Sequence, residues 1–261
     1  MEFENVLYEV KENGVATITL NRPASFNSFN DAHIADVLTA LDLAACDEKV
    51  RVLVLTGAGK SFSAGGDAAM LATMQTSFDA RYIFERSALL IKSMYEFPKP
   101  SIAAINGVAA GAATGLALAC DIVLAGDKAK FAANFVNIAF VPDGGTSFFL
   151  FNKLGPHRMA EILYTGTILS SEECLQAGLF NRVVPQDKLY DEVYVLASQI
   201  ADGPPITLKY MKQIIRTCAD SDLATIGTLE AGAQVMCWNS QDFREGITAF
   251  IEKRKPKFLG K

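Results

Sequence analysis

Apolar runs alternate with helical pattern through the first two thirds of the chain. The runs at 50–55, 101–105 and 121–125 are typical of strands that are buried on both faces. A long helical stretch at 79–95 and a small-residue helix near 111–119 separate them. Strand–helix–strand alternation favours βαβ units with right-handed crossovers. We therefore expect an α/β fold with a mostly parallel sheet.

Both ends of the chain depart from this alternation. Two β-rich runs, at 6–10 and 15–20, flank Asn13-Gly14, which is a strong hairpin signal. Beyond residue 145 the pattern is mainly helical, with a short strand expected at 182–184. The last predicted helices cover 187–201, 206–219, 222–237 and 241–254. We divide the chain into an α/β core, 1–185, and a helical C-terminal region, 186–261, that serves oligomerisation and closure of a site.

Composition and charge exclude several classes of protein. The 24 Lys and Arg against 29 Asp and Glu give a net charge of −5, which argues against a nucleic-acid partner. Only two histidines are present, so we expect no metal site. Five scattered cysteines without C-x-x-C spacing predict thiols in a reducing compartment, the cytoplasm.

Neither a secretory leader nor a membrane anchor is expected. Glu2, Glu4 and Glu9 put acid where a signal peptide carries base. The uncharged stretch at 102–120 is rich in Ala and Gly and lies between amphipathic segments. A buried strand and helix explain that stretch better than a membrane span.

Glycine-bearing loops follow the apolar strands at 57–67, 106–115 and 142–145. In open α/β folds ligands bind at the carboxyl ends of strands, so these loops are the candidate site. None matches a nucleotide fingerprint. The segment Gly57–Ser61 fails the P-loop spacing because Val54 stands where glycine is required.

Three segments lie around these loops: Leu55–Gly57, Ser61–Asp67 and Pro100–Gly111. In order and spacing they resemble the crotonase (enoyl-CoA hydratase/isomerase) superfamily. Shorter matches lie at 20–23, 120–122, 163–166 and 250–255. The resemblance implies a spiral of ββα units with a C-terminal α-helical region, assembled as a homotrimer or hexamer. It also implies acyl-CoA thioester substrates, as in fatty acid metabolism, with no cofactor beyond the coenzyme A of the substrate.

The same resemblance predicts an oxyanion hole of two backbone N–H groups that stabilises an enolate. By position the donors are Ala64 and Ala112. The alternative for such small residues is tight helix–strand packing. Further expected substrate contacts are Gly65, Gly66, Asp67, Ala68, Gly111, Phe135, Phe250 and Lys253.

Carboxylates decide which reaction is expected. The family's hydratases use two glutamates, and their positions here are Gly115 and Phe135, which cannot exchange protons. Asp143 remains, at a position where related isomerases carry their acid. Pro142-Asp143-Gly144 is also a good turn sequence, which is the plainer explanation. Neighbouring phenylalanines would raise the pKa of Asp143.

These observations predict a Δ3-to-Δ2 enoyl-CoA isomerase with Asp143 as its single acid/base. Two alternatives stay open: another crotonase-type isomerase of a catabolic acyl-CoA intermediate, and a non-catalytic acyl-CoA-binding protein. We interpret Asp67 mainly as a helix cap and Cys120 as a core residue. His33 and His157 lie beside no plausible nucleophile, so no catalytic triad is expected.

Overall fold

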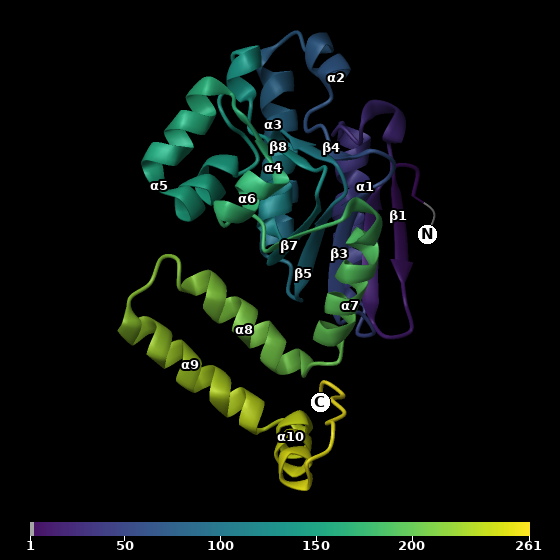
Figure 1. The fold of residues 1–261 in the computed structure, drawn as a ribbon, viewed down its shortest axis with the longest axis vertical. Coiled ribbons are helices and arrows are strands. Elements are labelled where there is room, and N and C mark those ends of the chain that lie inside the picture. The colour runs from purple at the N-terminus through teal and green to yellow at the C-terminus, as the bar shows by residue number, and fades with distance from the viewer. Residues whose placement is uncertain (1–2) are drawn as a thin grey trace.

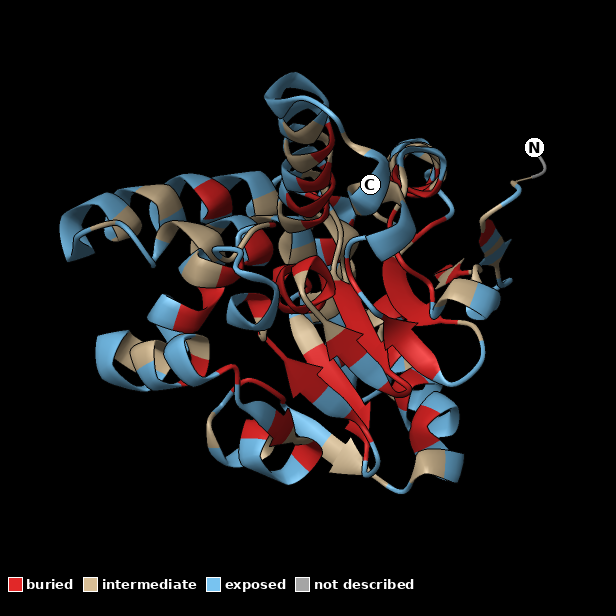
Figure 2. Cartoon of the chain, turned by 90° about the horizontal axis from the view of Figure 1, so that it is seen from above, coloured by how far each residue is buried: buried red, intermediate tan, exposed pale blue. Residues whose placement is uncertain are grey.

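The computed structural model describes residues 3–261. Glu2, one of the three acidic residues from which we expect no signal peptide, lies outside this range. Figure 1 shows a mixed α/β body from which an arm of helices, α8 to α10, projects. Buried residues concentrate on the strands at the centre of the molecule (Figure 2). Within the described range, no helix has the length and apolar character needed to cross a membrane.

A six-stranded sheet forms the centre of the body. Its order is β1-β2-β3-β5-β7-β10, and every pair except the β1–β2 hairpin is parallel. Gly14 turns the hairpin with φ of 83°, as Asn13-Gly14 predicted. The strands are β1 Val6–Val10, β2 Val15–Leu20, β3 Val52–Gly57, β5 Ser101–Ile105, β7 Ile122–Gly126 and β10 Arg182–Val184. The predicted mostly parallel sheet is confirmed.

A second sheet of short strands, in the order β4-β6-β8-β9, runs beside the first. These strands are β4 Ser61–Ser63, β6 Val108–Ala110, β8 Lys130–Ala132 and β9 Ile168–Ser170. In successive turns of the chain, one strand joins the large sheet and the next joins the small one before a helix returns. This is the spiral of ββα units that the resemblance implied, although the sequence pattern alone did not reveal the short strands.

The helices of the body begin at residues that satisfy their first N–H groups. Asn30 caps α1, Thr76 caps α3, and Ser170 with Glu173 forms the predicted capping box of α6. In α5 the helix breaks at Gly155, before Pro156, and the exposed His157 follows. The helices are α1 Asp31–Cys46, α2 Ala68–Thr73, α3 Ser77–Tyr95, α4 Ala112–Ala119, α5 Thr146–Thr165 and α6 Ser171–Gln176, with 3-10 turns η1 Pro23–Ser25, η2 Phe135–Ile138 and η3 Gln186–Lys188.

Helix α7, Leu189–Ala201, covers one face of the large sheet. Its buried residues Leu189, Val193 and Ala197 pack in one cluster with strand residues of that sheet. The predicted division after residue 185 would separate α7 from the sheet that it covers. By its packing α7 belongs with the core, and the chain leaves the body only after Ala201.

The arm consists of α8 Pro205–Thr217, α9 Leu223–Trp238 and α10 Gln241–Glu252. Lys212 and Arg216 of α8 fasten it to the body, because both cations lie within 2.8 Å of the Asp121 carboxylate. The arm leaves large apolar side chains in solvent: Ile215 is 69% exposed, Leu223 87% and Trp238 61%.

Candidate active site

A cavity of about 130 Å³ opens at the end of the body that carries α2. Its walls come from the loop after β4, from α2 and α3, from the start of α4, and from the segment 134–143. Predicted site residues in the lining are Ala64, Gly66, Gly111, Ala112, Phe135 and Asp143. Two of the three glycine-bearing loops meet here, and the third reaches the cavity through Asp143.

Among the described residues, Asp143 is the only acidic one in the lining. Its Oδ1 atom is buried and has no hydrogen-bond partner among the described residues. Burial raises the pKa of this carboxyl from 3.8 to about 6. A carboxyl with such a pKa can both accept and return a proton near neutral pH.

The loop of Asp143 is held against the start of α4. Thr146 donates its backbone N–H to the Asp143 carbonyl, and its hydroxyl meets that of Thr114 at 3.0 Å. Gly144 packs directly on Gly115, so a Cβ at Gly115 would overlap the Gly144 carbonyl oxygen. A glutamate in place of Gly115 would therefore require this loop to move, and Asp143 occupies the neighbourhood instead.

Ala112, the second predicted donor, lines the cavity. It is the first residue of α4, so its N–H has no acceptor within the helix, and none is found elsewhere in residues 3–261. The preceding Gly111 (φ 53°) and the neighbouring Gly65 (φ 80°) adopt conformations that suit glycine. A Cβ at Gly65 would lie 2.5 Å from the Ala110 oxygen and 3.1 Å from the Ala112 nitrogen. The two loops thus touch because Gly65 has no side chain.

The prediction that Ala64 donates its N–H to a ligand is wrong for this structure. That N–H is donated to the Phe26 carbonyl at 2.9 Å, because the segment after β2 runs beside the loop after β4. Two residues further on, the Gly66 N–H has no acceptor in the part of the chain that the structure describes. Gly66 lines the same cavity as Ala112 and Asp143. Gly66 and Ala112 therefore both bring a backbone N–H group without an acceptor among the described residues to the cavity lining.

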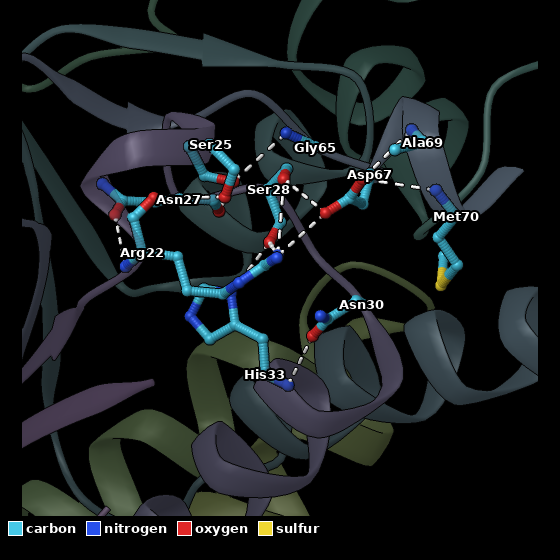
Figure 3. A network of polar contacts seen from close by, with 11 residues as sticks. Arg22, Ser25, Asn27, Ser28, Asn30, His33, Gly65, Asp67, Ala69 and Met70 are labelled. Carbon is cyan, nitrogen blue, oxygen red and sulfur yellow. Dashed lines mark hydrogen bonds and ion pairs between the residues drawn. The ribbon is translucent and has the colours of Figure 1, made fainter. Parts of the chain in front are cut away.

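The segment 22–30 holds the loop of Gly66 in place (Figure 3). Arg22 Nη1 bonds the Asp67 carboxylate at 3.0 Å and the Ser28 carbonyl, and the Ser28 hydroxyl bonds Asp67 as well. Asp67 also caps α2, as predicted, by accepting from the Ala69 and Met70 N–H groups. Burial raises the pKa of Asp67, but its hydrogen bonds from Arg22, Met70 and Ser28 outweigh burial and hold it below 3.8.

Asn27 is the buried centre of this segment. Its side-chain amide donates to the carbonyl oxygens of Ala58, Ser61 and Phe62, and its own carbonyl accepts from the Ser63 hydroxyl. The sequence reasoning assigned no role to this asparagine. A possible signal was the short stretch 26–28 between strand and helix, but its partners lie more than 30 residues away.

Five predicted contacts lie outside the cavity lining, and one of them is Gly65, whose contact with the Ala112 loop is described above. Asp67 caps α2 and Ala68 is the first residue of that helix, and neither lines the cavity. Phe250 and Lys253 belong to the end of α10, which lies at the opposite end of the molecule from α2 (Figure 1). A single chain therefore does not bring them to the cavity.

The two buried cysteines and the buried histidine belong to the core. Burial raises the pKa of Cys120 and of Cys174 to about 12, so both are protonated thiols of the core. His33 is buried under the 22–30 segment with Nδ1 on the Ser28 carbonyl, and burial lowers its pKa. Within residues 3–261, no cluster of three His, Cys, Asp or Glu residues could hold a metal ion.

Comparisons with known proteins agree with this architecture. The family model described as enoyl-CoA hydratase/isomerase matches residues 10–261. The chain is 38% identical to the 1,2-epoxyphenylacetyl-CoA isomerase of Escherichia coli, over 96% of this chain and 97% of that one. It is 35% identical to the trans-2-decenoyl-[acyl-carrier-protein] isomerase of Streptococcus mutans, over the whole of both chains.

A solved structure extends the likeness to three dimensions. The enoyl-CoA hydratase of Bacillus anthracis superposes with a TM-score of 0.96 at 32% identity, covering 99% of this chain and 100% of that one. The ββα spiral, the C-terminal helices and the sequence therefore point the same way. The chain belongs to the enoyl-CoA hydratase/isomerase family, the crotonase superfamily.

Proposed function

We propose that this protein is a single-base isomerase that moves the double bond of a 3-enoyl thioester from C3 to C2. The observation that carries the proposal is the Asp143 carboxyl. Among residues 3–261 this carboxyl is the only acid in the cavity lining, its Oδ1 is buried without a partner, and its pKa is raised to about 6. A hydratase of the two-glutamate kind is not supported, because Gly115 and Phe135 stand at those positions.

The reaction follows from one base and two donors. The Asp143 carboxylate takes a proton from C2, and the C2–H electron pair delocalises to the thioester oxygen as a dienolate. The N–H groups of Gly66 and Ala112 donate to that oxygen; one such donor is typically worth about 3 to 4 kcal/mol in the transition state. Asp143 then returns the proton to C4, which leaves the double bond at C2. Substrate and product are isomers, so no cofactor is needed beyond the coenzyme A of the substrate.

The arm supports an assembled form. Its exposed apolar residues Ile215, Leu223 and Trp238 are typical of surfaces covered in an oligomer. We extend the proposal to a homotrimer or hexamer in a reducing cytoplasm, in which Phe250 and Lys253 serve the site of a neighbouring copy. Light scattering should give a mass of three or six chains; a monomer at micromolar concentration would contradict this part.

Ultraviolet absorbance of the conjugated thioester tests the reaction directly. We expect native protein to convert 3-enoyl-CoA and Asp143→Asn to lose at least about 1,000-fold in rate, because one group makes both proton transfers. Asp220→Asn, an exposed aspartate on the arm, is the matched control. The assay should use 3-enoyl groups of several chain lengths, each as a thioester of coenzyme A and as a thioester of acyl carrier protein.

Three results would each change the assignment. Activity retained by Asp143→Asn would give the proton transfer to another group. Absence of signal from native protein on every substrate would exclude the isomerase. Tight acyl-CoA binding that is unchanged by Asp143→Asn would then favour the non-catalytic binding protein, and turnover of other enolisable thioesters would favour another crotonase-type reaction.

A further inference from the structure

The cavity is small for an acyl-binding site. Its volume of about 130 Å³ is close to that of an engineered cavity of about 150 Å³ that binds benzene. The rings of Phe84 and Phe140, both in the lining, meet edge to face with centroids 5.8 Å apart. An acyl group of about six non-hydrogen atoms therefore fills this volume.

One polar side chain besides Asp143 is buried in this apolar lining without a partner. Ser87 is 6% exposed, and its hydroxyl bonds no described residue. Hydroxyls elsewhere on helices of this protein behave differently: those of Thr39, Thr165 and Thr228 each donate to the carbonyl four residues earlier. A buried hydroxyl with no partner is costly, so a ligand that accepts its proton gains affinity.

Ser87 lies on α3, the helix that also packs against the loop of Asp143. One turn further along α3, Ile91 packs on the loop of Asp143, since a Cβ at Gly144 would lie 3.0 Å from Ile91 Cδ1. Ser87 precedes Ile91 by four residues, about 6 Å along the helix, toward Ile83 and Phe84. No hydrogen bond joins Ser87 to Asp143, although both line the cavity. A ligand atom beyond the reacting carbons can reach this hydroxyl.

We propose that the cavity selects short acyl groups that carry an oxygen atom, and that Ser87 donates a hydrogen bond to this oxygen. The acceptor is an ether, hydroxyl or epoxide oxygen on the part of the acyl group remote from the thioester. The direction from thioester to Ser87 rests on the proposed function, whereas the need of Ser87 for an acceptor does not.

Binding of saturated thioesters tests the proposal without any turnover. In 3-ethoxypropanoyl-CoA and 4-methoxybutanoyl-CoA, oxygen replaces C4 or C5 of hexanoyl-CoA; 6-hydroxyhexanoyl-CoA is compared with heptanoyl-CoA. By calorimetry we expect at least one oxygenated probe to bind native protein about tenfold or more tightly than its hydrocarbon counterpart. Ser87→Ala should reduce that ratio to about one, while Ser93→Ala, on the same helix outside the lining, should keep it.

Two outcomes would overturn the inference: no oxygenated probe preferred by native protein, or a preference that survives Ser87→Ala. A third would do so as well. If Ser87→Ala leaves the binding ratio unchanged but moves the pH dependence of turnover, the hydroxyl serves Asp143 and not the acyl group. Ser87→Cys, which keeps the side-chain shape with a somewhat larger atom and a much weaker donor, replaces Ser87→Ala if that variant does not fold. Because these probes cannot isomerise, failure of the isomerase assay leaves the binding result intact.

Discussion

The two walls of the cavity are built on opposite principles. In the wall formed by the 22–30 segment and the loop of Gly66, Arg22, Asn27 and Asp67 all have hydrogen-bonded partners. In the wall formed by α3 and the segment 134–143, Ser87 and Asp143 keep buried polar atoms without partners. Satisfied networks rigidify a structure, whereas unpaired buried groups cost stability until a ligand pairs them. The first wall positions backbone N–H groups, and the second supplies the groups that change partners.

The largest effect should come from a methyl group in the contact between the two loops. Gly65→Ala places its Cβ 2.5 Å from the Ala110 oxygen and 3.1 Å from the Ala112 nitrogen, at a φ of 80°. We expect turnover to fall about 100- to 1,000-fold, the usual cost of one lost oxyanion donor. The measurement is kcat on the best 3-enoyl thioester, with circular dichroism to show that the fold persists.

The adjacent glycine provides the comparison for this variant. A Cβ at Gly66 would meet only Leu71 Cδ1, at 3.5 Å, and leaves both N–H groups in place. Gly66→Ala should therefore lose at least about tenfold less activity than Gly65→Ala. Equal losses would mean that the loop tolerates no side chain for reasons other than the Ala112 N–H group.

The wall formed by α3 and the segment 134–143 should become more stable when the charge of Asp143 is removed. Burial raises the pKa of Asp143 from 3.8 to about 6, so the native state resists the ionisation that the unfolded chain undergoes freely. At pH 8 the free energy of unfolding of Asp143→Asn should therefore be about 2 to 3 kcal/mol higher than that of native protein. This gain should shrink as the pH falls from about 6 to 3.8 and vanish below. Urea unfolding at pH 8 and pH 4 measures it, with Asp220→Asn as control; a loss of stability at pH 8 would contradict the account.

The wall formed by the 22–30 segment and the loop of Gly66 should instead lose stability when a charge is removed from it. Arg22→Met removes the main partner of Asp67 and should cost about 1 to 2 kcal/mol at pH 7. The pKa of Asp67 is held below 3.8, so this contribution is present above 3.8 and is lost as the pH falls through the lower native value. Urea unfolding against Arg81→Met, which breaks an exposed pair with Glu85, is the test. Equal behaviour of the two variants would show that the network does not anchor the loop.

Long periodic elements could be predicted from the sequence because their signals are local. The strand at 101–105, the cap at Asn30 and the capping box at 170–173 all appear as expected. The three-residue strands of the second sheet could not be foreseen. Their backbone partners lie far along the chain, as when Ser61 of β4 pairs with Val108 of β6.

The candidate site was predicted in composition more than in geometry. Position in the motif pointed to Ala64, but the carbonyl of Phe26 occupies that N–H, and only the fold shows that Gly66 is available. Ser87 has the same sequence signature as any serine on a helix. Ser87 stands out because its hydroxyl has no hydrogen-bond partner among the described residues. The sequence does not show which groups the fold brings close to a side chain.

The pH dependence of kcat/KM for a 3-enoyl thioester tests the central claim most directly, because it reports ionisation of the acid/base in the free enzyme. With Asp143 in that role, the profile should rise with a midpoint of about 6 and level off by pH 8. Asp143→Asn should abolish this dependence together with the activity. A profile that is flat from pH 5 to 8, or one whose rise survives in Asp143→Asn, would show that a different group moves the proton.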